Sequence, residues 1–275
     1  MVLLAACSLF FFFFFFATHV AAEAPCPSGA WPAYAHNDYE NPRPLFDALQ
    51  AGFRGAEADV FLVEGELRVA HDRKQARPGR TLQALYLDPL RDVVARCGRV
   101  CADSIPFLLN VEIKQESPAA YDTLCAALRR YPDILSGVDH GVERSGPVEV
   151  ALVGWHPPLA TMERDAVRLA RPQLQVVKRS ITPDSSGIVR LVSLDYGKTI
   201  RWSGQSPFPS NGRAWLAALQ RAKHAAPGRT ARVYNVPARS EIYRVLLDSG
   251  VDLIGTKDLA ATRRALVALQ PVIHP

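Results

Sequence analysis

Short apolar runs with high strand propensity alternate along this chain with stretches in which apolar residues recur at helical spacing. The predicted strands are Trp31–His36, Gly55–Leu62, Phe107–Lys114, Val148–Trp155, Val189–Asp195, Ala231–Val236 and Val251–Gly255, with an eighth around Gln173–Arg179. The predicted helices between them are Pro44–Ala51, Thr81–Arg96, Ala119–Tyr131, Thr161–Ala170, Gly212–Ala225, Arg239–Ser249 and Leu259–Leu269. Strands that alternate with helices indicate βα units and a parallel sheet.

The number of βα units favours one closed barrel over an open sheet. Eight strands over about 250 residues match a (β/α)₈ TIM barrel in size, so we predict a single α/β domain of this kind over residues 23–275. A doubly wound sheet would require a glycine-rich first βα turn. The first turn here, residues 37–42, contains no glycine.

The amino-terminal segment has a different character. An apolar run from Val2 to Val20 includes seven consecutive phenylalanines, Phe10–Phe16, and ends in small residues. This pattern predicts a signal peptide over residues 1–22, cleaved after Ala22, and hence an exported protein. Because no Lys or Arg precedes the run and the run is long, an uncleaved amino-terminal anchor is the alternative.

Composition adds few constraints. Of the 275 residues, 48% are hydrophobic and 21% are charged, as in an ordinary globular protein, and the formal net charge is +5. No zinc-finger, RNP or basic-region motif is present, which argues against a nucleic-acid partner. The modest positive charge is compatible with an anionic substrate or a transient contact with a membrane surface, and we expect a monomer.

Four cysteines remain after the predicted signal: Cys26, Cys97, Cys101 and Cys125. An even number permits two disulfides with three possible connectivities. Cys97 and Cys101 lie four residues apart near a predicted helix end, which brings them close to bonding range. The spacings do not resemble a zinc site, and free buried thiols are the alternative.

Carboxylates gather on the inward faces of two predicted strands. Since side chains alternate along a strand, Glu57 and Asp59 share one face, as do Asn110, Glu112 and Lys114 in the next parallel strand. The apolar face of each strand packs on the helices, so these polar rows point into the barrel. Buried charges cost several kcal/mol unless they are paired or bound to a metal. With Lys114 as the nearby cation, the three carboxylates predict one hard divalent cation, Mg²⁺ or Ca²⁺.

Two histidines stand at the ends of neighbouring β segments. His36 follows the first predicted strand, and His71 follows the short hairpin of residues 63–70. Active sites of parallel barrels lie at the carboxyl edge of the strands. Imidazoles exchange protons near neutral pH, so His36 and His71 are predicted to act as base and acid on a phosphodiester. Lys114 is predicted to contact the substrate's phosphoryl oxygens.

The complete pattern resembles a known superfamily. His36, Glu57-x-Asp59, His71-Asp72 and Glu112-x-Lys114 are similar to the motifs of the glycerophosphodiester phosphodiesterase and phosphatidylinositol phospholipase C-like barrels. The run from Ala35 to Tyr39 and the segment Glu57–Val60 most resemble the branch named for altered inheritance of mitochondria protein six. The resemblance covers residues 33–114 and returns at Gly250–Leu259.

The resemblance implies a TIM barrel in which Glu57, Asp59 and Glu112 hold the metal and His36 and His71 exchange protons. It implies attack on phosphorus by a neighbouring hydroxyl, which gives a cyclic phosphate. Typical glycerophosphodiesterases carry Arg directly after the first His, where this chain has Asn37. We therefore place Asn37 among the residues expected to contact substrate, and the substrate itself stays open.

The predicted function is that of a metal-dependent phosphoric diester hydrolase. Its substrate would be a glycerophosphodiester, a phosphoinositide or a related lipid head-group phosphodiester. One alternative is a metal-dependent barrel hydrolase of the amidohydrolase type, although such sites require His-x-His on the first strand and this chain has His36-Asn37-Asp38. The other is a non-catalytic barrel that binds phosphate or lipid.

Overall fold

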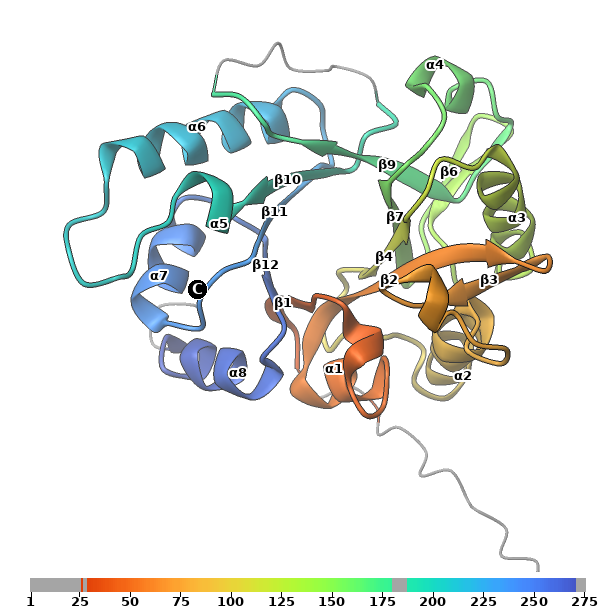
Figure 1. The fold of residues 1–275 in the computed structure, drawn as a ribbon, viewed down its shortest axis with the longest axis horizontal. Coiled ribbons are helices and arrows are strands. Elements are labelled where there is room, and N and C mark those ends of the chain that lie inside the picture. The colour runs from red at the N-terminus through yellow and green to blue at the C-terminus, as the bar shows by residue number, and fades with distance from the viewer. Residues whose placement is uncertain (1–25, 27–28, 180–186, 271–275) are drawn as a thin grey trace, which may run out of the picture.

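Eight parallel strands close into a barrel in the computed structural model, which describes residue 26 and residues 29–179 and 187–270. Neighbours around the barrel follow the order β1, β12, β11, β10, β9, β7, β4 and β2, and β1 pairs with β2 to close it. The strands are β1 (Trp31–Ala35), β2 (Phe53–Val63), β4 (Phe107–Ile113), β7 (Val148–Gly154), β9 (Ala170–Gln175), β10 (Leu191–Asp195), β11 (Thr230–Tyr234) and β12 (Leu253–Thr256). The predicted (β/α)₈ barrel is confirmed (Figure 1).

Helices surround the barrel and cover the outward apolar face of its strands (Figure 1). They are α1 (Phe46–Ala51), α2 (Asp88–Cys97) with the one-turn π-helix η3 (Gln83–Leu87) before it, α3 (Pro118–Leu128), α4 (Leu159–Met162), α5 (Tyr196–Thr199), α6 (Ser210–His224), α7 (Ser240–Asp248) and α8 (Leu259–Val267). Each of the longer helices is amphipathic in the expected sense. In α7, for example, Ile242, Tyr243 and Leu246 are buried.

One predicted helix is wrong. The apolar residues between Thr161 and Ala170 fit helical spacing, but α4 ends at Met162. The chain then forms β8 (Val167–Arg168), which pairs antiparallel with β5 (Gly137–Asp139). Tertiary pairing therefore overrides a short periodic signal. The eighth barrel strand exists but begins three residues earlier than predicted, at Ala170.

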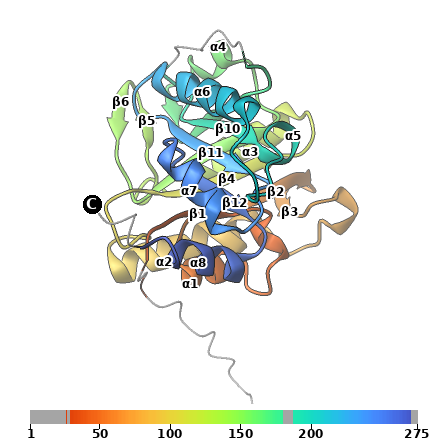
Figure 2. The ribbon, with the colours of Figure 1, turned by 90° about the vertical axis from the view of Figure 1, so that its left-hand side faces the viewer.

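Two β elements lie outside the barrel, and the sequence predicted one of them. The predicted hairpin after β2 is confirmed, because β3 (Glu66–Val69) pairs antiparallel with β2 and projects to the right in Figure 2. A small sheet of β5, β8 and β6 (Val142–Arg144) was not predicted, since each of its strands has only two or three residues.

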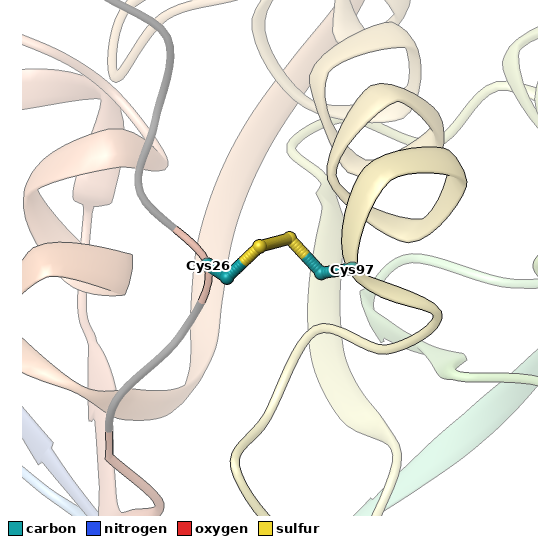
Figure 3. Close-up of a disulfide and its surroundings, with 2 residues drawn as sticks. All are labelled: Cys26 and Cys97. Atoms are coloured by element: carbon teal, nitrogen blue, oxygen red, sulfur yellow. A yellow bond between two sulfur atoms is a disulfide. The ribbon is translucent and has the colours of Figure 1, made fainter.

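The described part of the chain contains one disulfide, whose pairing the sequence had left open. Cys26 is bonded to Cys97 at the carboxyl end of α2 (Figure 3), whereas Cys101 and Cys125 are free. Gly98 adopts a left-handed conformation and ends α2, and Cys101 is buried in the core beyond it. The helical separation that suggested a Cys97–Cys101 bond is therefore not present. Burial raises the pKa of the Cys101 thiol to about 12.

A second apolar cluster fills the interior of the barrel. It consists of Tyr34, Leu108, Ala151, Val153, Leu191 and Leu253. Tyr34 reaches across to β12, where a Cβ on Gly255 would lie 2.4 Å from its ring. The barrel is thus a packed core that supports the polar edge above it. Among the residues that the structure describes, no helix combines the length and hydropathy needed to cross a bilayer.

The segment 1–25, which contains the predicted signal peptide, lies outside the described residues.

Candidate active site

Three carboxylates converge at the carboxyl end of β2 and β4. Glu57 and Asp59 are buried on the inward face of β2, and Asp59 pairs in register with Glu112 of β4. Ligand atoms of the three residues all lie within 4.8 Å of one another, so the group can hold a metal ion. Their placement on one inward face is what the strand alternation predicts.

The unfilled bonding capacity of Asp59 fits a cation. Its Oδ2 atom accepts a hydrogen bond from Tyr39 (2.7 Å) and lies 3.2 Å from Lys114 Nζ. Its Oδ1 atom is buried and has no hydrogen-bond partner among the described residues. A buried carboxylate oxygen without a donor is costly, and a hard divalent ion is the partner that such an oxygen prefers.

A buried arginine that the sequence analysis did not consider also faces this cluster. Arg232 of β11 donates to Glu57 Oε2 at 3.0 Å, and only 2% of its surface is exposed. Lys114, which bridges Asp59 and Glu112 at 3.2 Å each, is therefore not the only nearby cation. The three carboxylates face two cations, which leaves one negative charge and a smaller electrostatic demand for the metal than predicted.

Burial dominates the protonation of the cluster. It raises the pKa of Glu57 to about 7, although the charge of Arg232 acts in the opposite direction. Burial and the charge of Asp59 raise the pKa of Glu112. Burial alone would lower the pKa of Lys114, but Asp59 and Glu112 outweigh it and raise that pKa. Low dielectric thus makes the carboxylates receptive to a counter-ion.

His36 stands against the first of these carboxylates. Its Nε2 atom lies 3.4 Å from Glu57 Oε1, and its ring packs edge-on against Tyr234 of β11. Burial, followed by the positive charges of Arg232 and Lys257, lowers the pKa of His36 to about 4. The ring is therefore neutral near pH 7 and can accept a proton.

His71 stands against the second carboxylate and is more exposed. Its Nδ1 atom lies 3.3 Å from Asp59 Oδ2 and 3.1 Å from the hydroxyl of Tyr39. These contacts hold Nδ1, and no described residue forms a hydrogen bond with Nε2. Thus the two carboxylates of β2 each contact one of the two predicted catalytic histidines. Tyr39, which links Asp59 to His71, was present in the motif but was not recognised as a site residue.

The turn after β1 explains why asparagine follows the first histidine. Asn37 has φ 51°, a left-handed conformation that Asn tolerates better than most residues. Its amide donates to Glu40 at 3.1 Å and lies 3.4 Å from His71 Nδ1. The described contacts of Asn37 are therefore with the turn and with His71, and its contact with substrate stays a prediction.

Hydrogen bonds to the side chain of Asp38 hold the same turn in place. Its buried carboxylate accepts hydrogen bonds from the Leu45 amide (2.5 Å), the Tyr86 hydroxyl (3.0 Å) and Asn41 (3.1 Å). The short 3₁₀ helix η1 (Asp38–Glu40) is held in this way between His36 and α1. Burial raises the pKa of Asp38 to about 6 despite these donors.

We expect Asp38→Asn to remove a pH dependence of stability. Because the pKa of Asp38 is higher in the folded than in the unfolded chain, its contribution to the free energy of unfolding decreases as pH rises from about 4 to about 6. An amide cannot ionise, so the melting temperature of the variant relative to wild type should rise between about pH 4.5 and pH 7.5. Thermal unfolding at both pH values measures this, with Asp92→Asn, exposed on α2, as control. A constant difference between the variant and wild type would contradict the assignment.

A cavity of about 440 Å³ opens beside His36 and the carboxylates. Its other walls come from β7, β9, β11 and the residues after β7, and the lining side chains there include His156, Gln173, Gln175, Arg232 and Tyr234. Neither His156 nor Tyr234 was among the predicted site residues, and the structure places both at the cavity. No local pattern distinguishes Gln173 or Gln175.

Gly154 at the end of β7 makes room for Glu112. It has φ 71°, and an added Cβ would lie 2.6 Å from the Ile113 carbonyl oxygen and 2.8 Å from Glu112 Cγ. Both contacts are too short for any side chain. The position of one metal-site carboxylate therefore depends on a glycine in the neighbouring strand.

We expect Gly154→Ala to displace Glu112 and so to lower the predicted phosphodiester hydrolysis by about 10- to 100-fold, because small displacements in an active site have effects of this size. Gly141→Ala is a matched control, since Gly141 also has positive φ (82°) but nothing within 4 Å of an added Cβ. Both variants carry the backbone cost of about 1 kcal/mol for a left-handed alanine, and steady-state kinetics separates them. Equal activity of the two would show that Glu112 does not need this space.

The fold and the site together define a (β/α)₈ barrel with a carboxylate cluster and two histidines at the carboxyl edge of its strands. The sequence model of the AIM6-like phosphodiesterase domain matches residues 29–103. This span carries His36, Glu57, Asp59 and His71. The predicted resemblance to the superfamily and to this branch is confirmed.

Curated relatives extend the similarity over most of the chain. An altered inheritance of mitochondria protein 6 homolog of Arthroderma benhamiae is 25% identical, with 84% of this chain and 82% of the relative covered. Altered inheritance of mitochondria protein 6 of Eremothecium gossypii is 26% identical, with 84% and 68% covered. These names state no chemical reaction.

Among solved structures, a glycerophosphodiester phosphodiesterase from Agrobacterium tumefaciens is similar with a TM-score of 0.48 and 14% identity. The match covers 86% of this chain and 98% of that one.

Proposed function

We propose that this protein is a divalent-cation-dependent phosphoric diester hydrolase that acts on a glycerophosphodiester, a phosphoinositide or a related lipid head-group phosphodiester. The observation that carries the proposal is the carboxylate cluster of Glu57, Asp59 and Glu112, with an unpartnered Asp59 oxygen and a histidine against each carboxylate of β2. Glu57, Asp59 and Glu112 would hold one Mg²⁺ or Ca²⁺. A bound cation supplies positive charge to the phosphoryl oxygens as negative charge develops there.

Each of the two histidines would carry out one of the two proton transfers. His36, neutral near pH 7, accepts the proton of the attacking hydroxyl while the oxygen of that hydroxyl bonds to phosphorus. The bond from phosphorus to the leaving oxygen breaks, and His71 donates a proton to that oxygen. Tyr39 and Asp59 hold His71 Nδ1 during this step. If the hydroxyl belongs to the substrate the product is a cyclic phosphate, and if it belongs to water the product is a phosphomonoester.

His36 is buried against Glu57 and neutral near pH 7, which is the protonation state that a base requires. Lys114, which lies between Asp59 and Glu112, would contact the phosphoryl group from the side of β4. We further propose that the protein is exported and monomeric. The Cys26–Cys97 disulfide supports export, because stable disulfides form in oxidising compartments.

Hydrolysis of bis(p-nitrophenyl) phosphate and glycerophosphocholine, with and without EDTA, tests the function. We expect turnover that EDTA abolishes and that Mg²⁺ or Ca²⁺ restores. Turnover of an amide substrate in place of the diesters would favour an amidohydrolase-type barrel. Binding of phosphodiesters without turnover in the presence of either cation would favour a non-catalytic barrel.

A further inference from the structure

A chain of hydrogen bonds links the buried Arg232 to the wall of the cavity. Arg232 Nη2 donates to Gln173 Oε1 at 2.6 Å, and Ser193 Oγ, which accepts from Arg232 Nε at 2.9 Å, donates to the same oxygen. A guanidinium can only donate hydrogen bonds. The Gln173 oxygen must therefore face Arg232, and its amide nitrogen must face the cavity side.

The orientation of the Gln173 amide also fixes that of the Gln175 amide. Gln173 Nε2 donates to Gln175 Oε1 at 3.2 Å. The oxygen of Gln175 is thus occupied, and its NH₂ group is left as a donor at the cavity that both side chains line. The fixed charge of Arg232 therefore decides which end of the Gln175 amide a ligand meets.

His156 offers the complementary group on the same cavity. Its Nδ1 atom lies 2.7 Å from the carbonyl oxygen of Pro157. A carbonyl oxygen only accepts, so Nδ1 carries the proton in the neutral ring, and Nε2 is left as an acceptor. A donor and an acceptor thus stand at this wall, and neither belongs to a carboxylate, a lysine or an arginine.

The charges around the cavity limit the ligand that this pair can recognise. Of the residues described as lining it, the carboxylates are Glu57 and Glu112, which belong to the cation site, and the arginine is Arg232, whose three nitrogens each donate to Glu57, Gln173 or Ser193. A quaternary ammonium has no N–H to give His156 and requires aromatic faces or a free carboxylate. The tyrosine at this cavity, Tyr234, already has the Arg232 guanidinium 5.1 Å from its ring centroid and the His36 ring in an edge contact. A hydroxyl both donates and accepts, and so satisfies Gln175 and His156 together.

We propose that Gln175 and His156 form a head-group subsite that selects a polyol over a quaternary ammonium. The proposal rests on the proposed function, because it assigns this cavity to the alcohol portion of the phosphodiester. A cavity of about 440 Å³ accommodates a group of that size beside the carboxylates. Gln173, Ser193 and Arg232 act behind Gln175 as positioning residues.

Equilibrium binding tests the subsite without dependence on turnover. Dissociation constants of glycerophosphoinositol and glycerophosphocholine are measured by calorimetry, with Ca²⁺ present, in a His36→Gln background. We expect glycerophosphoinositol to bind about tenfold more tightly, as expected for two additional hydrogen bonds. Adding Gln175→Leu or His156→Phe should reduce this preference to about two- to threefold, whereas Gln50→Leu, exposed on α1, should leave it intact.

Equal binding of the two compounds, or a preference that survives Gln175→Leu, would overturn the subsite. Either result would leave the proposed function standing if the protein with His36 intact hydrolyses bis(p-nitrophenyl) phosphate, which has no polyol. Conversely, a preference lost on Gln175→Leu would support the subsite even if that hydrolysis is not observed and the proposed function fails.

Discussion

His36→Gln is expected to lower the rate of phosphodiester hydrolysis by about 1,000-fold. A positioned general base contributes roughly 10²- to 10⁴-fold, and the neutral His36 ring beside Glu57 is the base proposed above. Glutamine keeps polarity and approximate size but cannot accept a proton near neutral pH. The loss should appear in kcat for bis(p-nitrophenyl) phosphate, and the melting temperature should change little.

The matched control for this change is His224→Gln, at the exposed carboxyl end of α6. It should retain wild-type kinetics. If His36→Gln kept more than about a tenth of the wild-type kcat, His36 would not be the base. The same measurement on His71→Gln would then show whether the two roles are reversed.

Glu112→Gln is expected to lower the affinity for the activating cation by at least about 100-fold. Loss of a residue that merely orients a ligand costs 10- to 100-fold in metal affinity, and Glu112 would itself be a ligand. The substitution removes one of the three negative charges and preserves the shape of the side chain. Half-buried Glu112 also tolerates an amide sterically better than fully buried Asp59.

The measurement is activity of EDTA-treated protein titrated with Mg²⁺ or Ca²⁺. The midpoint should shift to higher cation concentration in Glu112→Gln and stay unchanged in Glu116→Gln, which is exposed in the following loop. Full activity of wild type after exhaustive chelation would remove the cation from the mechanism. An unchanged midpoint in Glu112→Gln would remove Glu112 from the cation site.

The outline of the barrel could be predicted because its signals are local. Seven of the strand predictions fall within a few residues of the observed strands, since each barrel strand combines an apolar run with flanking turns. The features that the sequence missed or left open depend on partners distant in the chain. Val167–Arg168 forms a strand only because β5 lies beside it, and Cys97 is bonded to Cys26 across 71 residues.

The site residues also fall into those that the sequence predicts and those that only the structure reveals. The shared inward face of Glu57 and Asp59 follows from the two-residue period of a strand, and the sequence alone is sufficient to group them with Glu112 and the two histidines. The alternating row Thr230, Arg232 and Tyr234 in β11 was the available signal for Arg232. It could not reveal that Arg232 reaches Glu57, which lies 175 residues earlier.

By itself, then, the sequence determined the barrel, the carboxylate rows and the histidines at the strand ends, because each depends on periodicity within a few neighbouring residues. Only the tertiary structure decided that Arg232 offsets part of the negative charge, that Tyr39 joins Asp59 to His71, and that His156 and Gln175 share a cavity. These contacts depend on how strands distant in sequence align around a closed barrel. That alignment is fixed by packing of the whole core and not by any local pattern.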